Sequence, residues 1–64
     1  MKLKYDKEQD VLYFLLSDEK IFESDEEKAG VIIDYSANGR IVGIEVLNAS
    51  RNVSNPSKVE YEIA

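Results

Sequence analysis

The stretch "AGVIIDYSANGRIVGIEVL", residues 29–47, decides the fold of this chain. Two apolar runs flank Asn38-Gly39, a dipeptide whose residues both tolerate the positive φ angles of a tight hairpin turn. Gly43 inside the second run predicts a bulge or the close approach of another backbone. The stretch therefore predicts an antiparallel hairpin with strands over residues 29–36 and 39–47.

The same letters also fit the calcium-binding loop of an EF-hand. Within "DYSANGRIVGIE", residues 34–45, the loop positions are filled by Asp34, Ser36, Asn38, Gly39 and Glu45. Two helices hold such a loop, whereas both flanks here have strand patterns. From Gly39 to Glu45 a strand advances roughly 20 Å, so Glu45 cannot return to a cation near Asp34. The hairpin is the preferred interpretation.

Four other segments have strand patterns. Residues 2–6 alternate, with lysines on the exposed side of an edge strand. Residues 11–17 are apolar on both faces, which requires cover on both sides. A short strand is predicted near residues 20–24, followed by an exposed acidic connection. Residues 58–64 alternate again and predict a last, half-buried strand.

We therefore predict one domain over residues 1–64, mainly β, built as a small antiparallel β-meander of five or six strands from hairpins. An α+β variant stays open, because Asn48 can cap a single helical turn before Pro56. A chain this short buries only roughly 60% of its unfolded surface. Without cysteine it has no disulfide to reinforce it, so a homodimer is expected.

Composition excludes several functions. Thirteen acidic and eight basic residues give a net charge of −5, which suits a small basic partner protein and not a phosphate backbone. With neither His nor Cys, the usual zinc ligands and the Ser–His and Cys–His nucleophiles are missing, so neither an enzyme nor a cofactor is expected. "MKLKYDKEQD" lacks the apolar region of a signal peptide, and no apolar run is long enough for a membrane span. A cytoplasmic location is expected.

Two carboxylates are candidates for a functional surface. Asp34 and Glu45 lie on opposing strands of the predicted hairpin at similar offsets from its turn, and Tyr13 and Tyr35 complete the candidate surface. No catalytic, metal-binding or cofactor-binding residue is assigned. The first hypothesis is a non-catalytic protein–protein interaction module. The alternative is a small-ligand or divalent-ion-binding domain that uses Asp34 and Glu45.

The segments "YDKEQDVLYFLLS" and "GVIIDYSANGRIVGIEVLNAS" resemble a family of small bacterial and archaeal proteins, domain of unknown function 2283. The matching positions are Tyr5, Asp6, Asp10, Val11, Leu12, Tyr13, Gly30, Val31, Asp34, Tyr35, Gly39, Gly43, Ile44, Glu45, Leu47, Ala49 and Ser50. This chain has Ser36 and Asn38 where the family's turn usually carries more aspartate. The resemblance implies a small β-rich domain without an assigned activity and, by analogy alone, an antitoxin-like role beside a basic toxin.

Overall fold

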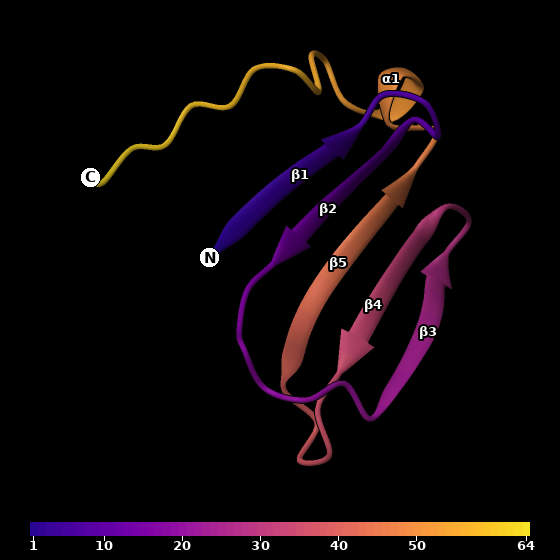
Figure 1. Cartoon of the computed structure of the whole chain (residues 1–64), viewed down its shortest axis with the longest axis vertical. Coiled ribbons are helices and arrows are strands. Elements are labelled where there is room, and N and C mark those ends of the chain that lie inside the picture. Colours follow the sequence, from indigo (N-terminus) through magenta and orange to yellow (C-terminus); the bar gives the residue numbers. More distant parts are fainter.

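Five antiparallel strands form one sheet in the computed structural model, which describes residues 1–64 (Figure 1). The elements are β1 (Lys2–Asp6), β2 (Val11–Leu15), β3 (Glu23–Lys28), β4 (Val31–Tyr35), β5 (Ile41–Leu47) and the single helical turn α1 (Ala49–Asn52). The predicted fold class, mainly β with hairpins and one helical turn, is confirmed. No helix in the chain is long and apolar enough to cross a membrane.

The strand order is β1-β2-β5-β4-β3, which departs from a simple meander at one connection. Residues 16–22 cross one end of the sheet, so that β2 pairs with β5 instead of with β3 (Figure 1). The physical reason is burial. The apolar β2 gains from a place between two strands, whereas the acidic β3 is stable at an edge.

The hairpin of β4 and β5 is confirmed, but its turn differs from the prediction. The Ser36 N–H donates to the Arg40 carbonyl at 2.8 Å, and the Gly39 N–H donates to the Ser36 carbonyl at 3.0 Å. Gly39 has a φ of 83°, whereas Asn38 does not have a positive φ. The predicted positive φ at Asn38 is therefore wrong. In this three-residue loop, a turn is followed by one left-handed position, which glycine fills.

The prediction for the acidic segment is also wrong. The pattern predicts a strand near residues 20–24 with an exposed connection after it, but β3 covers Glu23–Lys28 and contains the acidic run itself. Every residue of β3 is exposed. At an edge, β3 needs only its backbone to pair with β4, so the acidic side chains stay in water.

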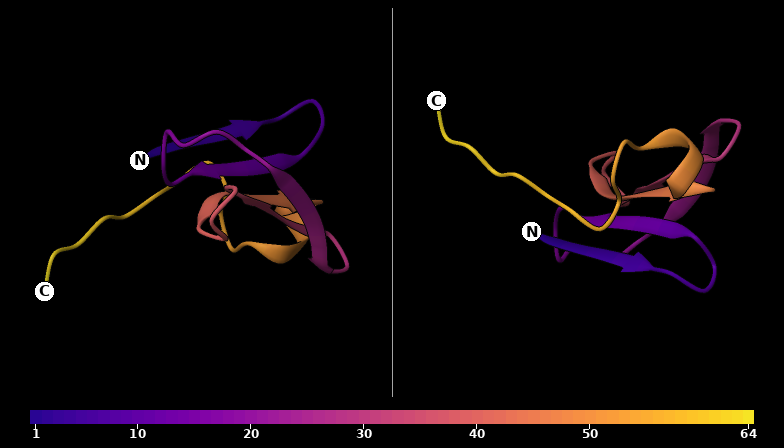
Figure 2. Two further views of the ribbon diagram at one scale, coloured as in Figure 1. Left: turned by 90° about the horizontal axis from the view of Figure 1, so that it is seen from below. Right: turned by 90° about the horizontal axis from the view of Figure 1, so that it is seen from above.

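Residues 58–64 do not form the predicted half-buried strand. They lie outside every strand and are all exposed, with Val59, Tyr61 and Ile63 exposed to 59, 75 and 83%. The segment leaves the sheet on the side of β1 (Figures 1 and 2). Its alternating pattern is typical of a strand, but no strand of the chain pairs with it.

The predicted helical turn is present as α1, directly after β5. Asn48 occupies the position before the helix, but with a left-handed φ of 51° and no side-chain capping bond. The expected capping by the Asn48 side chain is therefore absent. The backbone carbonyl of Asn48 accepts hydrogen bonds from the Arg51 N–H at 3.0 Å and from the side-chain amide of Asn52 at 3.1 Å.

The sheet has two faces, which follow from the register because cross-strand partners share a face. The apolar face contains Leu3, Tyr5, Leu12, Phe14, Val31, Ile33, Ile44 and Val46. The opposite side, which we call the Tyr13 face, contains Val11, Tyr13, Leu15, Ile32, Asp34, Gly43, Glu45 and Leu47. The sheet is strongly twisted (Figure 2). Most side chains on both faces are only half-buried.

Candidate functional site

Three of the four candidate residues share the Tyr13 face. Tyr13 lies directly opposite Glu45 in the pairing of β2 with β5, and Asp34 lies opposite Gly43 in the pairing of β4 with β5. Tyr35 is the next residue after Asp34, so strand alternation turns it to the other side of the sheet. The structure therefore brings Tyr13, Asp34 and Glu45 to one surface and separates Tyr35 from them.

The Asp34 carboxylate is buried, with 9% of the residue exposed. The Tyr13 hydroxyl donates to Oδ2 at 3.1 Å, and the Ser24 hydroxyl donates to Oδ1 at 2.6 Å. Each carboxylate oxygen thus has its own donor. A buried charge without such donors would be strongly destabilising, so the two hydroxyls explain how Asp34 is accommodated.

Gly43 makes the contact between Tyr13 and Asp34 possible. A Cβ atom at this position would lie 2.5 Å from the Tyr13 hydroxyl oxygen and 3.1 Å from the carbonyl oxygen of Phe14. The Tyr13 side chain therefore passes over β5 at the one residue of that strand that has no side chain. The sequence predicted a bulge or a close backbone approach at Gly43. The register of β4 with β5 does shift here, because Asp34 pairs with Gly43 and Tyr35 pairs with Ile41. The group that approaches Gly43 most closely is, however, a side chain.

The environment of Tyr13 keeps its hydroxyl protonated. Burial raises the pKa of Tyr13 above its ordinary value, and the hydrogen bond to Asp34 and the charges of Asp34 and Glu45 raise it further. A phenol with a raised pKa is a hydrogen-bond donor at neutral pH and not a base. The Tyr13–Asp34 pair is thus suited to holding strands together.

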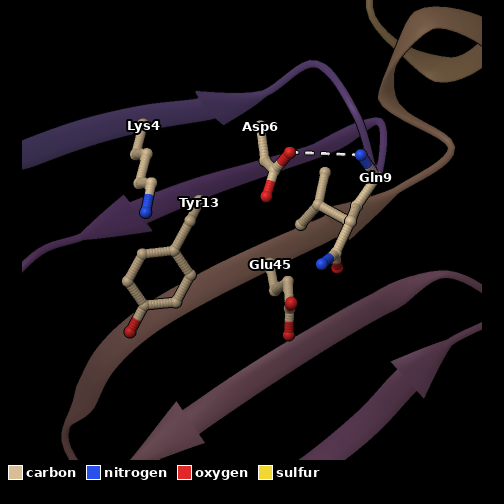
Figure 3. A pocket seen from close by; sticks show the side chains of 6 residues that line it. Lys4, Asp6, Gln9, Tyr13 and Glu45 are labelled. Carbon is tan, nitrogen blue, oxygen red and sulfur yellow. Dashed lines mark hydrogen bonds between the residues drawn. The ribbon is translucent and has the colours of Figure 1, made fainter.

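Glu45 has a different environment from Asp34. The residue is half-buried, yet its carboxylate makes no hydrogen bond and no ion pair. It lines a shallow hollow of about 260 Å³ beside β1 and β2 (Figure 3). The other lining residues are Lys4, Asp6, Gln9, Val11 and Tyr13. Charges of both signs therefore surround an unpaired carboxylate at this place.

The donor set for a divalent ion is incomplete on this face. Asp34 and Glu45 are not directly opposite each other, because Glu45 pairs with Ile32 and Asp34 with Gly43. No cluster of three or more Asp or Glu side chains with the geometry of a metal site is found. Calcium takes six to eight oxygen ligands, and both oxygens of Asp34 already accept hydroxyl bonds.

A second carboxylate with several hydrogen bonds, Asp10, links the turn after β1 to α1. Asp10, in the turn between β1 and β2, has a left-handed φ of 57°. Its carboxylate accepts hydrogen bonds from the Tyr5 hydroxyl at 2.7 Å, the Ser50 hydroxyl at 2.7 Å and the Ser50 N–H at 2.9 Å. Its carbonyl accepts the N–H of Ala49, which is fully buried. The first hairpin is thereby fixed to α1.

These bonds shift the pKa values of Asp10 and Tyr5 in opposite directions. The hydrogen bond from Ser50, followed by that from Tyr5, lowers the pKa of Asp10. The hydrogen bond to Asp10 raises the pKa of Tyr5. The carboxylate is therefore charged and the phenol neutral over the whole neutral pH range, which preserves the cluster.

Tyr35 belongs to a third group, on the opposite side of the sheet from Asp34. Its hydroxyl donates to a carboxylate oxygen of Glu27 on β3. This bond, with burial and with the charges of Glu27, Asp25 and Glu23, raises the pKa of Tyr35 to about 12. Tyr35 thus stabilises the acidic edge strand and has no contact with the Tyr13 face.

A family model described as Protein of unknown function (DUF2283) matches residues 2–50 of the 64-residue chain. The chain belongs to this family. No curated protein and no solved structure matches the chain significantly. The part matched by the DUF2283 model contains β1 to β5 and the two carboxylates that each accept two hydroxyl hydrogen bonds, Asp34 and Asp10. Residues 51–64 lie outside the match.

Sequence reasoning missed two features of this DUF2283 member. Ser24 falls in the predicted short strand before the acidic connection, and nothing local shows that its hydroxyl faces Asp34; only the register of β3 with β4 reveals it. Asp10 and Ser50 both belong to the resemblance, but their contact spans 40 residues. Both residues occur beside turns, where short polar side chains bind backbone groups, and this position is the only local signal of their role.

Chemically, Asp34 and Asp10 act as structural links in the DUF2283 chain. Asp34 and Asp10 are both enclosed by hydroxyl donors, which leaves them few free lone pairs. Glu45 is the carboxylate of the candidate surface that stays available. It is suited to contact a cationic group of a ligand or of a partner protein.

Proposed function

We propose that this chain is a non-catalytic protein–protein interaction module that acts as a homodimer or bound to a partner protein. The observation that carries the proposal is the apolar surface that one copy leaves uncovered. The buried hydrophobic residues are only Leu12, Val42 and Ala49. Eight large hydrophobic side chains are exposed, from Met1 to Ile63. Contiguous exposed apolar surface marks interaction sites in stable proteins.

Four of the exposed side chains lie along one end of the sheet, and we name them the end patch: Leu16, Ile21, Phe22 and Ile41. The backbone explains their proximity. The Leu16 N–H donates to the Val42 carbonyl at 2.8 Å, and the Phe22 N–H donates to the Tyr35 carbonyl at 2.7 Å. Tyr35 pairs with Ile41. Phe22, exposed to 70%, is the strongest candidate anchor for a partner, since buried aromatic anchors dominate binding energy.

Charge favours a small basic protein as the partner of a heterologous complex. The chain carries a net charge of −5, and the exposed edge strand β3 contributes four carboxylates over Glu23–Lys28. Complementary charge raises association rates and selects against acidic partners. An antitoxin-like role, in which the module neutralises a basic toxin in the cytoplasm, is the specific form of this proposal that the family resemblance suggests.

The experiment combines two measurements on the full chain. Sedimentation equilibrium is expected to give a dimer for the purified protein, and purification of the tagged chain from its own cells is expected to recover a stoichiometric complex. Phe22→Ser should weaken the partner complex, whereas Lys20→Ser, an exposed control beside it, should not. A monomer that recovers no stoichiometric partner would overturn the proposal.

A second candidate function is favoured by one observation. The Glu45 carboxylate is unpaired and lines the hollow of about 260 Å³, whereas the Asp34 carboxylate already accepts two hydroxyl bonds. Glu45 is therefore the better candidate to hold a ligand in a small-ligand or divalent-ion-binding domain. Calorimetric titration with calcium and with magnesium tests it directly. A tight, stoichiometric isotherm that Glu45→Gln abolishes would favour this candidate over the interaction module.

A further inference from the structure

We propose that residues 58–63 form a strand that pairs with β1 of a second copy, so that two chains exchange their C-terminal segments. The inference rests on the proposed homodimer and states which residues form it. It begins from two unpaired stretches. β1 is an edge strand that pairs only with β2, and residues 59–64 make no backbone hydrogen bond.

One antiparallel register matches the apolar residues of the two stretches. With Tyr61 opposite Leu3, Val59 falls opposite Tyr5, and all four side chains extend the apolar face of the sheet. Leu3 and Tyr5 are already half-buried on that face. Val59 and Tyr61 are exposed to 59 and 75% in the single copy. Pairing would therefore bury apolar area on both partners, which is the main favourable contribution to association.

The same register matches the charges on the other face. Its cross-strand partners are Lys58 opposite Asp6, Glu60 opposite Lys4 and Glu62 opposite Lys2. Every one of these pairs joins opposite charges, and opposite charges directly across a sheet are stabilising. Apolar and charged residues thus agree on one alignment, although the two sets lie on different faces.

The other edge of the sheet is excluded by charge. β3 carries Glu23, Asp25, Glu26 and Glu27, so a strand containing Glu60 and Glu62 would place like charges beside them. The lysines of β1 discourage pairing with unrelated or basic strands, as exposed edge strands generally require. The same lysines favour an acidic strand, so they select this partner against others.

The course of the chain favours a second copy over the chain's own β1. The Lys58 N–H donates to the Asn55 carbonyl at 3.1 Å, which forms a turn around Pro56. Val59 still lines a hollow with Leu3 and Tyr5 of its own chain, but beyond it the segment projects away from the sheet in both views (Figure 2). Its own β1 is left without a partner. In a two-fold dimer each segment meets the β1 of the other copy, and both free edges are closed by the same contact.

Charge reversal in the full chain tests the proposal. The edge variant carries Lys2→Glu and Lys4→Glu, and the segment variant carries Glu60→Lys and Glu62→Lys; all four side chains are exposed, so folding is retained. Each variant alone places like charges in both contacts. By sedimentation equilibrium we expect each to dimerise roughly tenfold or more weakly. Charge-matched controls are Lys20→Glu with Lys28→Glu, and Glu8→Lys with Asp18→Lys.

Mixing the two variants separates exchange between copies from closure within one chain. In the mixed dimer the segment of each chain meets an edge of opposite charge, so equimolar mixing should restore dimerisation. Contact within one chain cannot be repaired by mixing, but it would be repaired in a single chain that carries all four substitutions. That second pattern would overturn the exchange.

Two further outcomes distinguish this inference from the proposed function. If the native chain is a dimer and neither charge reversal weakens it, the strand exchange is wrong while the interaction module stands. If the native chain is a monomer at every concentration and recovers no partner, the proposed function fails and the exchange fails with it.

Discussion

The hydroxyl of Tyr13 on β2 donates a 3.1 Å hydrogen bond to Asp34 on β4, across the whole width of β5. Strands that are not neighbours are thus joined by one side chain. The link exists because Gly43 of β5 leaves the path over that strand free. A tyrosine, an aspartate and a glycine that are distant in sequence form one structural unit.

Gly43→Ala is expected to destabilise the fold by about 1–3 kcal/mol, the usual cost of overpacking. The new Cβ would lie 2.5 Å from the Tyr13 hydroxyl oxygen, so the ring has to move and the bond to Asp34 is lost. Urea denaturation measures the change. In a Tyr13→Ala background the same substitution should cost less, and equal costs in both backgrounds would contradict the steric explanation.

Removing either hydroxyl from Asp34 is expected to destabilise the fold. Tyr13→Phe and Ser24→Ala each leave one oxygen of a buried carboxylate without its donor, which costs about 1–3 kcal/mol. Ser54→Ala is the matched control, because Ser54 is exposed and makes no side-chain hydrogen bond. Thermal denaturation measures the three variants. If Ser54→Ala lowers the melting temperature as much as Tyr13→Phe and Ser24→Ala do, the two hydroxyls do not stabilise the fold through Asp34.

Tyr35 should be among the last groups of the protein to titrate. The Glu27 hydrogen bond is the largest cause that raises its pKa to about 12, so Glu27→Gln should lower the pKa towards 10.0. Because the folded-state pKa is the higher one, the stabilisation is present below pH 10 and is lost as the pH rises towards 12. Ultraviolet absorbance of tyrosinate, measured as the pH is raised, compares the tyrosine titration of the native protein with that of Glu27→Gln. An unchanged curve for Glu27→Gln would contradict the assignment.

Acid should weaken the link between the first hairpin and α1. Hydrogen bonds, led by that of Ser50, lower the pKa of Asp10 below 3.8 in the folded state. The stabilisation is therefore complete above pH 3.8 and is lost as the pH falls through the folded-state value. In Ser50→Ala the melting temperature should be lower at neutral pH and should fall less steeply in acid. Parallel pH profiles for the two proteins would count against this.

Gly39→Ala should cost about 1–2 kcal/mol, since a residue with a Cβ atom is strained at the left-handed φ of 83°. Nothing lies within 4 Å of the place that a Cβ atom would occupy, so the cost is conformational and not steric. Ala37→Ser, in the same exposed turn, should change stability by less than about 0.5 kcal/mol. Equilibrium denaturation compares them, and equal effects would contradict the argument.

Local patterns were enough to predict much of this fold. Alternation predicts β1, a continuous apolar run predicts β2, and two apolar runs on either side of Asn38-Gly39 predict the hairpin of β4 and β5. Each of these signals lies within a few residues of sequence. Membership of the family was also visible from the motif residues between Tyr5 and Ser50, and the family model confirms it.

Features that depend on neighbouring strands could not be predicted in this way. β3 is a strand only because β4 offers a backbone to pair with, and its acidic residues give a poor strand signal of their own. Residues 58–64 show the reverse case, a clear strand pattern without a partner in the copy. The Tyr13–Asp34 contact required the order β2-β5-β4, which no local sequence signal contains.

The pairing of β2 with β5 also has a consequence for how the chain folds. Hairpins close within a few residues, but the β2–β5 seam joins Val11 to Leu47, and closing so long a loop is entropically slow. We expect β3, β4 and β5 to assemble first and the β1–β2 hairpin to dock last. Pulse-labelled hydrogen exchange during refolding should then protect the backbone N–H groups of Ile33 and Glu45, which face β3 and β4, before that of Leu12, which faces β5. The hydrogen bonds from Ser50 to Asp10 form when the β1–β2 hairpin docks, and they stabilise the docked state.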